Sequence, residues 1–89
     1  MSDVRVDPPE VRGAVRNFIL TEFLPEEDPS SLKDDTPLVS GGVLDSISTA
    51  RLVSFLEGLY GIRFKPHEVG GVRMDTVNRI VEAVEGKVR

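Results

Sequence analysis

The sequence contains no cysteine and no tryptophan, and the first of these absences excludes several kinds of chemistry. Without cysteine there are no disulfides, no thiolate metal ligands and no cysteine nucleophile, so any thiol chemistry must be brought in by a cofactor. Aromatic residues make up only 6% of the chain, so its core must consist mainly of valine, leucine and isoleucine. A core of this composition suits packed helices.

Long apolar runs are missing as well. No stretch reaches the roughly 18 apolar residues of a membrane-spanning helix, and the first nine residues are polar rather than signal-like. We therefore expect a cytoplasmic protein without a membrane span. A chain of 89 residues is short, so we also expect one domain covering residues 1–89, a monomer, and little room for an enclosed catalytic cavity.

The acidic side chains are unevenly distributed along the chain. The net charge is -4, and seven acidic residues stand against one lysine between Glu22 and Asp45. A concentrated acidic segment repels phosphate backbones, so it argues against nucleic acid and predicts a basic protein partner. Within it, Glu26–Asp28 together with Asp34 and Asp35 form either a solvated loop or a steering surface for that partner. Their spacing matches no calcium loop, and no metal site is predicted.

A helix is predicted over about residues 8–24, because apolar residues recur there at helical spacing. Asp7 and Pro8 supply a start signal, and Glu10 completes a capping box. The next stretch, residues 25–44, has three prolines, two adjacent glycines and no periodicity. A loop this long usually has a function, and its spaced leucines and valines predict that it is pinned onto the helices.

Two more helices are predicted in the second half of the chain. One covers about residues 45–60 with Asp45 as its N-cap, and the last covers about residues 75–85 with Asp75 as its cap. A short helix is expected at 66–69. No strand-like alternation is long enough for a sheet. The predicted fold is therefore all-α: a small antiparallel bundle of three main helices plus one short helix, with a long first loop.

The stretch Gly41–Ile47 runs from the long loop into the predicted second helix and carries the chemistry. It places the Ser46 hydroxyl in the first turn of a helix, where unpaired N–H groups and the helix dipole favour an anion such as a phosphodiester. The adjacent glycines are expected to leave the backbone accessible to a modifying enzyme. Taken alone, the pair Asp45-Ser46 is also ordinary helix capping, so this pattern leaves both interpretations open.

With its surroundings, this stretch resembles the attachment motif of the acyl carrier and peptidyl carrier protein family. That motif is Asp-Ser-Leu or a close variant at the start of the second helix, and here it reads Asp45-Ser46-Ile47. The order of the helices, the long first loop and the spacing from Phe64 to Val77 also match the family. The resemblance extends as far as Val84. The resemblance implies a carrier and not an enzyme. Such a carrier would hold an acyl or aminoacyl group as a thioester on a 4'-phosphopantetheine arm attached to Ser46. It would work in fatty acid, polyketide or other specialised biosynthesis.

The resemblance also implies partners. A phosphopantetheinyl transferase would move the arm from coenzyme A to Ser46, and a ligase, synthase or transferase would load the acyl or aminoacyl group. In the family, the position of Asp45 lies in the transferase's contact surface. The only histidine, His67, has no acid partner at a recognisable spacing, so no catalytic residue is predicted. The alternative function is an unmodified helical protein-interaction domain.

The predicted second helix departs from the acidic pattern common in this family. Its face away from the core carries Ile47, Ala50, Arg51 and Ser54. Together with Asp45 at the helix start, these are the predicted partner-binding residues. Ile47 either folds back on the loop or contacts partners and the arm. Arg51 is either an ordinary solvated charge or a sign that the partners differ from those of the usual fatty acid synthase carrier.

Overall fold

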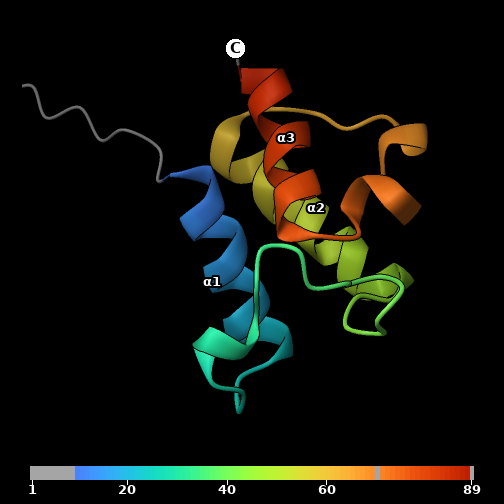
Figure 1. Cartoon of the computed structure of the whole chain (residues 1–89). Coiled ribbons are helices and arrows are strands. Elements are labelled where there is room, and N and C mark those ends of the chain that lie inside the picture. Colours follow the sequence, from blue (N-terminus) through green and yellow to red (C-terminus); the bar gives the residue numbers. More distant parts are fainter. Residues whose placement is uncertain (1–9, 70, 89) are drawn as a thin grey trace, which may run out of the picture.

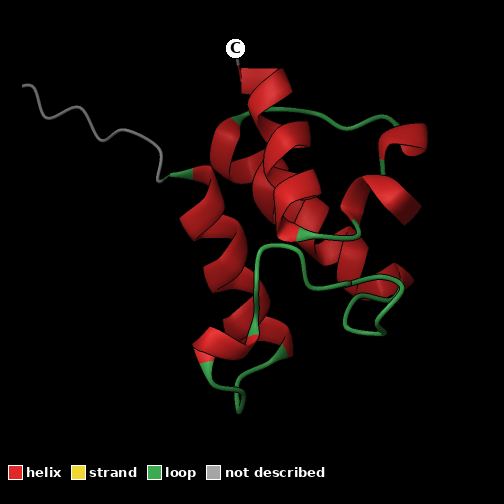
Figure 2. Ribbon diagram, in the orientation of Figure 1, coloured by secondary structure: helices red, strands yellow, loops and turns green. Residues whose placement is uncertain are grey.

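The computed structural model describes residues 10–69 and 71–88 and contains only helices and loops within those ranges (Figure 2). The all-α prediction is confirmed, although the described residues form three short helices where one was expected. None of the described helices is long and apolar enough to cross a membrane. The α-helices are α1 (Val11–Phe23), α2 (Ser46–Tyr60) and α3 (Val77–Val88), and the 3-10 helices are η1 (Pro29–Ser31), η2 (Pro66–Glu68) and η3 (Gly71–Met74).

The three α-helices form a bundle in which α1 packs against both α2 and α3 (Figure 1). In Figure 1, α1 descends while α2 and α3 both rise, so α1 is antiparallel to each of them. The connection that carries η2 and η3 crosses back over the bundle after α2, and α3 therefore starts near the same end as α2. The unpredicted helix η3 lies in this connection.

The start of α1 differs from the prediction. The helix begins at Val11, three residues later than expected, because Glu10 has extended backbone angles (φ -57°, ψ 134°) and acts as the N-cap itself. Its carboxylate accepts a hydrogen bond of 3.2 Å from the backbone N–H of Gly13. Glu10 therefore caps the helix directly instead of completing a capping box, and the predicted start at Asp7 and Pro8 lies outside the described residues.

The start of α3 also differs from the prediction. Asp75 is not its cap: the hydroxyl of Thr76 accepts a hydrogen bond of 3.1 Å from the backbone N–H of Arg79, and the carbonyl of Thr76 accepts one from Ile80. The Asp75 side chain binds the long loop instead. At the other end the helix continues to Val88, three residues beyond the predicted end, since the exposed Gly86 does not interrupt it.

One cluster of buried apolar side chains holds the three helices and the long loop together. The prediction that the loop is pinned is confirmed, because Leu32, Leu38 and Leu44 are buried in this cluster. Burying one leucine stabilises the fold by roughly 1.5–3 kcal/mol relative to leaving it exposed. The single domain over residues 1–89 stays a prediction. The other members of the cluster are Val11, Val15, Ile19, Leu52, Val53, Leu56, Ile62, Met74, Val77, Ile80, Val81 and Val84.

Candidate functional site

Ser46 is the first residue of α2, and the helix start is fixed by the residue before it. Asp45 has an extended backbone (φ -96°, ψ -171°), and its carboxylate accepts a hydrogen bond of 2.8 Å from the backbone N–H of Ser48. Its carbonyl accepts a second bond of 2.8 Å from Thr49. The bond from Ser48 lowers the pKa of the Asp45 carboxyl, so the cap is ionised at neutral pH. The predicted N-cap is confirmed.

The Ser46 side chain is open to solvent and to reagents. It is exposed, and no residue in the described part of the chain hydrogen bonds to its hydroxyl. A buried or already bonded hydroxyl would have to lose those contacts before it could be modified, and Ser46 has none to lose. The geometry therefore fits a covalently attached group at the first turn of α2, where the helix dipole favours a phosphodiester.

The loop before Ser46 is held by its own backbone. The N–H groups of Val43 and Leu44 both donate to the carbonyl of Leu38, at 2.8 and 2.9 Å, which closes a tight turn. Gly42 has a φ of +85°, a region that residues with a Cβ rarely adopt. At Gly41 a Cβ would collide with the carbonyl oxygen of Pro37. The turn that precedes Ser46 thus requires both glycines. The sequence interpretation missed this role of the glycines.

Asp75 fastens this turn to the start of α3. Its carboxylate accepts hydrogen bonds of 2.8 Å from the backbone N–H groups of both Val39 and Ser40, and the Ser40 hydroxyl donates to it as well. Its carbonyl accepts a bond of 2.6 Å from Leu38. The hydrogen bonds from Ser40 are the main reason why the pKa of the Asp75 carboxyl is lowered. A residue about thirty positions away thus supports the loop that leads to Ser46.

A shallow hollow of about 670 Å³ lies beside Ser46, along α2. The structure brings together there four of the five predicted partner-binding residues, and Asp45 is the exception because it lies on the other side of Ser46. Two aromatic residues that also pack against the buried cluster, one from α1 and one from α2, complete the hollow. The hollow is lined by Phe18, Ser46, Ile47, Ala50, Arg51, Ser54 and Phe55.

The surroundings of two of these residues bear on the alternatives left open for them. Ile47 is 74% exposed, so it does not fold back on the loop. Arg51 is not simply solvated: its guanidinium forms an ion pair of 2.6 Å with Glu22 and lies 5.5 Å from the ring centre of Phe23. Both partners belong to the last turn of α1. Sequence periodicity places neither of them beside α2, because they are 28 and 29 positions away from Arg51.

A second hollow, of about 560 Å³, lies on the opposite side of Ser46 and also includes it. Ser46 therefore lines both hollows, which it shares with Phe18 of α1 on one side and with Val39 of the long loop and Val69 on the other. Asp45, the fifth predicted partner-binding residue, lines this second hollow. Its lining residues are Val39, Gly42, Leu44, Asp45, Ser46, Thr49 and Val69.

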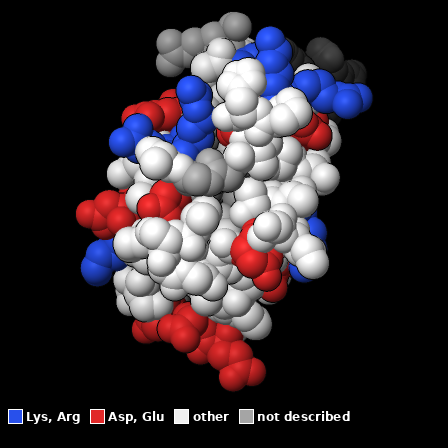
Figure 3. Space-filling model, turned by 90° about the vertical axis from the view of Figure 1, so that its right-hand side faces the viewer, with Lys and Arg blue, Asp and Glu red and all other residues white. Residues whose placement is uncertain are grey.

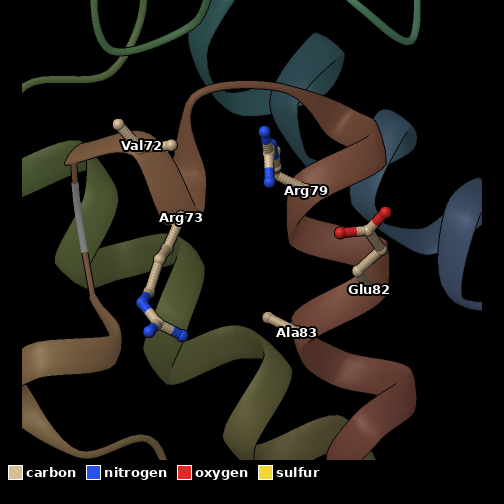
Figure 4. A pocket seen from close by; sticks show the side chains of 5 residues that line it. All are labelled: Val72, Arg73, Arg79, Glu82 and Ala83. Carbon is tan, nitrogen blue, oxygen red and sulfur yellow. The ribbon is translucent and has the colours of Figure 1, made fainter.

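A third hollow, of about 480 Å³, lies between η3 and α3 and does not include Ser46 (Figure 4). Arg73 reaches into it from η3, and Arg79 and Glu82 border it from α3. Val72 and Ala83 complete the lining. None of these five side chains carries a hydroxyl, a thiol or an imidazole, and the motif around Ser46 does not extend to this hollow.

The acidic segment divides into a structural and an exposed part. Asp34 forms ion pairs with Arg12 at 2.9 Å and Arg16 at 3.1 Å, so it ties the long loop to α1. Glu26–Asp28 are exposed. Figure 3 shows acidic side chains gathered at the lower end of one face and lysine and arginine at its upper end. Within the described ranges, no group of three or more histidine and acidic residues is placed to hold a metal ion.

In the described part of the chain, the fold and the site fit a small helical carrier: an exposed serine stands at the start of α2. Comparison with known proteins agrees, although no family model matches the chain. It is 44% identical over 59 residues to a D-alanyl carrier protein of Streptococcus uberis, covering 66% of this chain and 73% of that protein. It is 40% identical over 75 residues to the D-alanyl carrier protein of Streptococcus sanguinis, covering 84% and 91%.

The D-alanyl carrier protein of Streptococcus gordonii is 41% identical over 75 residues, with the same coverage of 84% and 91%. This chain belongs to the family of acyl and peptidyl carrier proteins. It is a carrier and not an enzyme, as the sequence predicts. The relatives named here are D-alanyl carriers, so they give no support to the predicted fatty acid or polyketide role.

Proposed function

We propose that this protein carries D-alanine as a thioester on a 4'-phosphopantetheine arm attached to Ser46. The observation that carries the proposal is the exposed Ser46 hydroxyl, free of hydrogen bonds to the described residues, at the first turn of α2. The cargo is taken from the relatives, which are named D-alanyl carrier proteins. We also keep the prediction that the protein works in the cytoplasm.

The residues around Ser46 suit the arm. When bound, the arm supplies the thiol that a cysteine-free chain lacks. The Ser46 oxygen would form the new bond to the phosphorus that carries pantetheine while the diphosphate bond of coenzyme A breaks. Adenosine 3',5'-bisphosphate would leave, and the hydroxyl proton would pass to a base of the transferase or to water. Asp45 holds the first turn of α2 in place by accepting from Ser48. The N-terminal end of α2 then favours the phosphodiester charge by about 0.3–1 kcal/mol.

The partners follow from the two reactions that the arm requires. A phosphopantetheinyl transferase attaches it, and a ligase loads the alanyl group. We propose that both dock on the surface formed by Asp45, Ile47, Ala50, Arg51 and Ser54, since Ser46 lies among these residues. The two hollows that flank Ser46 support this assignment, because together they include all five.

The test is attachment of the arm. Incubation with coenzyme A, Mg²⁺ and a broad-specificity transferase should add one phosphopantetheine mass per chain, measured by mass spectrometry of the intact protein. Ser46→Ala should abolish the gain. Ser31→Ala is the matched control, because Ser31 is an exposed serine in η1 that lines neither hollow at Ser46, and its gain in mass should equal that of the wild type.

Two further results would decide against the proposal. If a known carrier is modified under the same conditions and this chain is not, the alternative of an unmodified interaction domain replaces it. The cargo is tested separately, by incubating the modified protein with D-alanine, ATP and a ligase that loads D-alanyl carrier proteins. A modified protein that accepts an acyl group but not D-alanine would contradict the cargo alone.

A further inference from the structure

We propose that α1 takes part in partner docking: Glu22 cancels the charge of Arg51, so that the surface beside Ser46 fits an uncharged, apolar patch on the loading enzyme. This inference rests on the proposed function, because it assigns the partner chemistry of the same site. It differs from the expectation drawn from composition, since the acidic segment that begins at Glu22 predicts a basic partner.

The centre of this surface is apolar. Ile47 is 74% exposed and lies in the same hollow as the rings of Phe18 and Phe55. Those two rings stack with their centres 4.3 Å apart and an angle of 19° between their planes. An exposed isoleucine beside a stacked aromatic pair gains from being covered by another apolar surface. The hollow therefore suits an apolar side chain from a partner.

The single charged residue of the hollow is neutralised from the neighbouring helix. Among the lining residues only Arg51 carries a charge, and the carboxylate of Glu22 lies 2.6 Å from its guanidinium. The ring of Phe23 covers part of the same guanidinium at 5.5 Å. Both members of the ion pair are partly exposed, so the pair stabilises the fold little. Its main effect is electrostatic, because two opposite charges this close leave almost no net field farther out.

A neutral surface has a measurable consequence for docking. Long-range attraction between charged surfaces is weakened by salt, which screens charges over about 8 Å at physiological ionic strength. Docking through Ile47 and the aromatic pair does not depend on that attraction. The affinity of the loading enzyme for this protein is thus expected to change little with salt, unlike that of a carrier that docks through unpaired acidic residues.

Continuity with the attachment site indicates which partner covers this surface. Ser46 lines the same hollow as Ile47, Arg51 and Phe55. An enzyme that reaches the base of the arm must therefore come close to these residues. We assign the surface to the enzyme that loads the arm, and a second copy of this chain is the competing occupant that the experiment separates.

The experiment uses the full-length protein carrying its arm, with a ligase that loads D-alanyl carrier proteins, D-alanine and ATP. The KM of the ligase for the wild type should change little between low and moderate salt. Ile47→Ser should raise KM about tenfold, since one apolar contact is lost. Val72→Ser is its matched control, because Val72 is 70% exposed but lines only the hollow away from Ser46, and its KM should be unchanged.

The ion pair is tested by a double-mutant cycle. Glu22→Gln leaves Arg51 uncompensated and Arg51→Gln leaves Glu22 uncompensated, so each should raise KM several-fold. The double variant is again neutral and should recover a KM close to that of the wild type. Glu26→Gln is the control for Glu22→Gln, because Glu26 is an exposed acid without a described ion-pair partner. Circular dichroism checks that every variant keeps the fold.

Each contrary result has a defined meaning. If the double variant keeps the raised KM of Arg51→Gln, the partner recognises the arginine charge itself and the inference is wrong. If the wild type forms a dimer that Ile47→Ser dissociates, a second copy covers the surface and the inference is also wrong. Failure to gain the arm at Ser46 overturns the proposed function, whereas normal attachment and loading with unchanged KM values overturn this inference alone.

Discussion

The carboxylate of Asp75 accepts hydrogen bonds from the backbone N–H groups of Val39 and Ser40, each at 2.8 Å, and so joins the start of α3 to the loop that leads into α2. Aspartate before a helix usually caps it, and here Thr76 does so instead. Asp75 is thereby available to hold the segment that presents Ser46. Its role is positional, because its contacts are with the loop and not with Ser46.

Asp75→Ala should loosen that loop. The two amides lose their acceptor, so hydrogen exchange at Val39 and Ser40 should become faster while exchange inside α2 changes much less. Thermal stability should fall, and attachment of the arm to Ser46 should become slower. Glu82→Ala, an exposed acid on α3 without a described hydrogen bond, should change none of these. Unchanged exchange at Val39 and Ser40 would contradict the proposed role of Asp75.

Asp45 combines a structural and a recognition role, and two substitutions separate them. Asp45→Ala removes the cap on Ser48 and should lower both thermal stability and the rate of arm attachment. Asp45→Asn keeps a capping oxygen, since asparagine caps helices about as well as aspartate, and should retain most of the stability. If the arm is then attached more slowly to Asp45→Asn than to the wild type, the cause is the lost charge of the carboxylate. Equal stability of the two variants would show that the cap contributes nothing.

Two glycines, one in the turn before Ser46 and one near the end of α2, should respond to alanine in opposite directions. Gly41→Ala places a Cβ against the carbonyl of Pro37 and should destabilise the protein by more than about 1 kcal/mol. Gly58→Ala lies within α2 with no heavy atom near the added Cβ, and should stabilise it by roughly 0.5–1 kcal/mol. Chemical denaturation measures both. A neutral Gly41→Ala would mean that the turn before Ser46 adapts easily.

Stability should fall in acid partly through Glu68. Hydrogen bonds from the backbone N–H of Lys65 and from Lys87 lower the pKa of its carboxyl from the ordinary 4.5 to about 2. A carboxyl with a lowered folded-state pKa contributes stability above its unfolded value, and this contribution is lost as the pH falls from 4.5 toward 2. Glu68→Gln should flatten this part of the curve, as measured by denaturation at a series of pH values. An unchanged slope would contradict the assignment.

Those features that depend on neighbours along the chain could be read from the sequence. The cap at Asp45 involves Ser48 three positions later, and the buried faces of the helices follow from apolar residues spaced three and four apart. Ser46 at the first turn of α2 follows from the same local signals. The exposed position of Ile47 was left open, because periodicity identifies a face of the helix but not what the preceding loop covers.

Other features were decided only by the tertiary structure. Packing of α1 against α2 brings Glu22 to Arg51, and the return of the chain through η3 brings Asp75 to Val39 and Ser40. Such pairs are separated by many residues, and side-chain types alone do not say which of many possible partners will meet. The sequence therefore determined that Ser46 stands at a helix start, whereas the fold determined what supports it and which surface surrounds it.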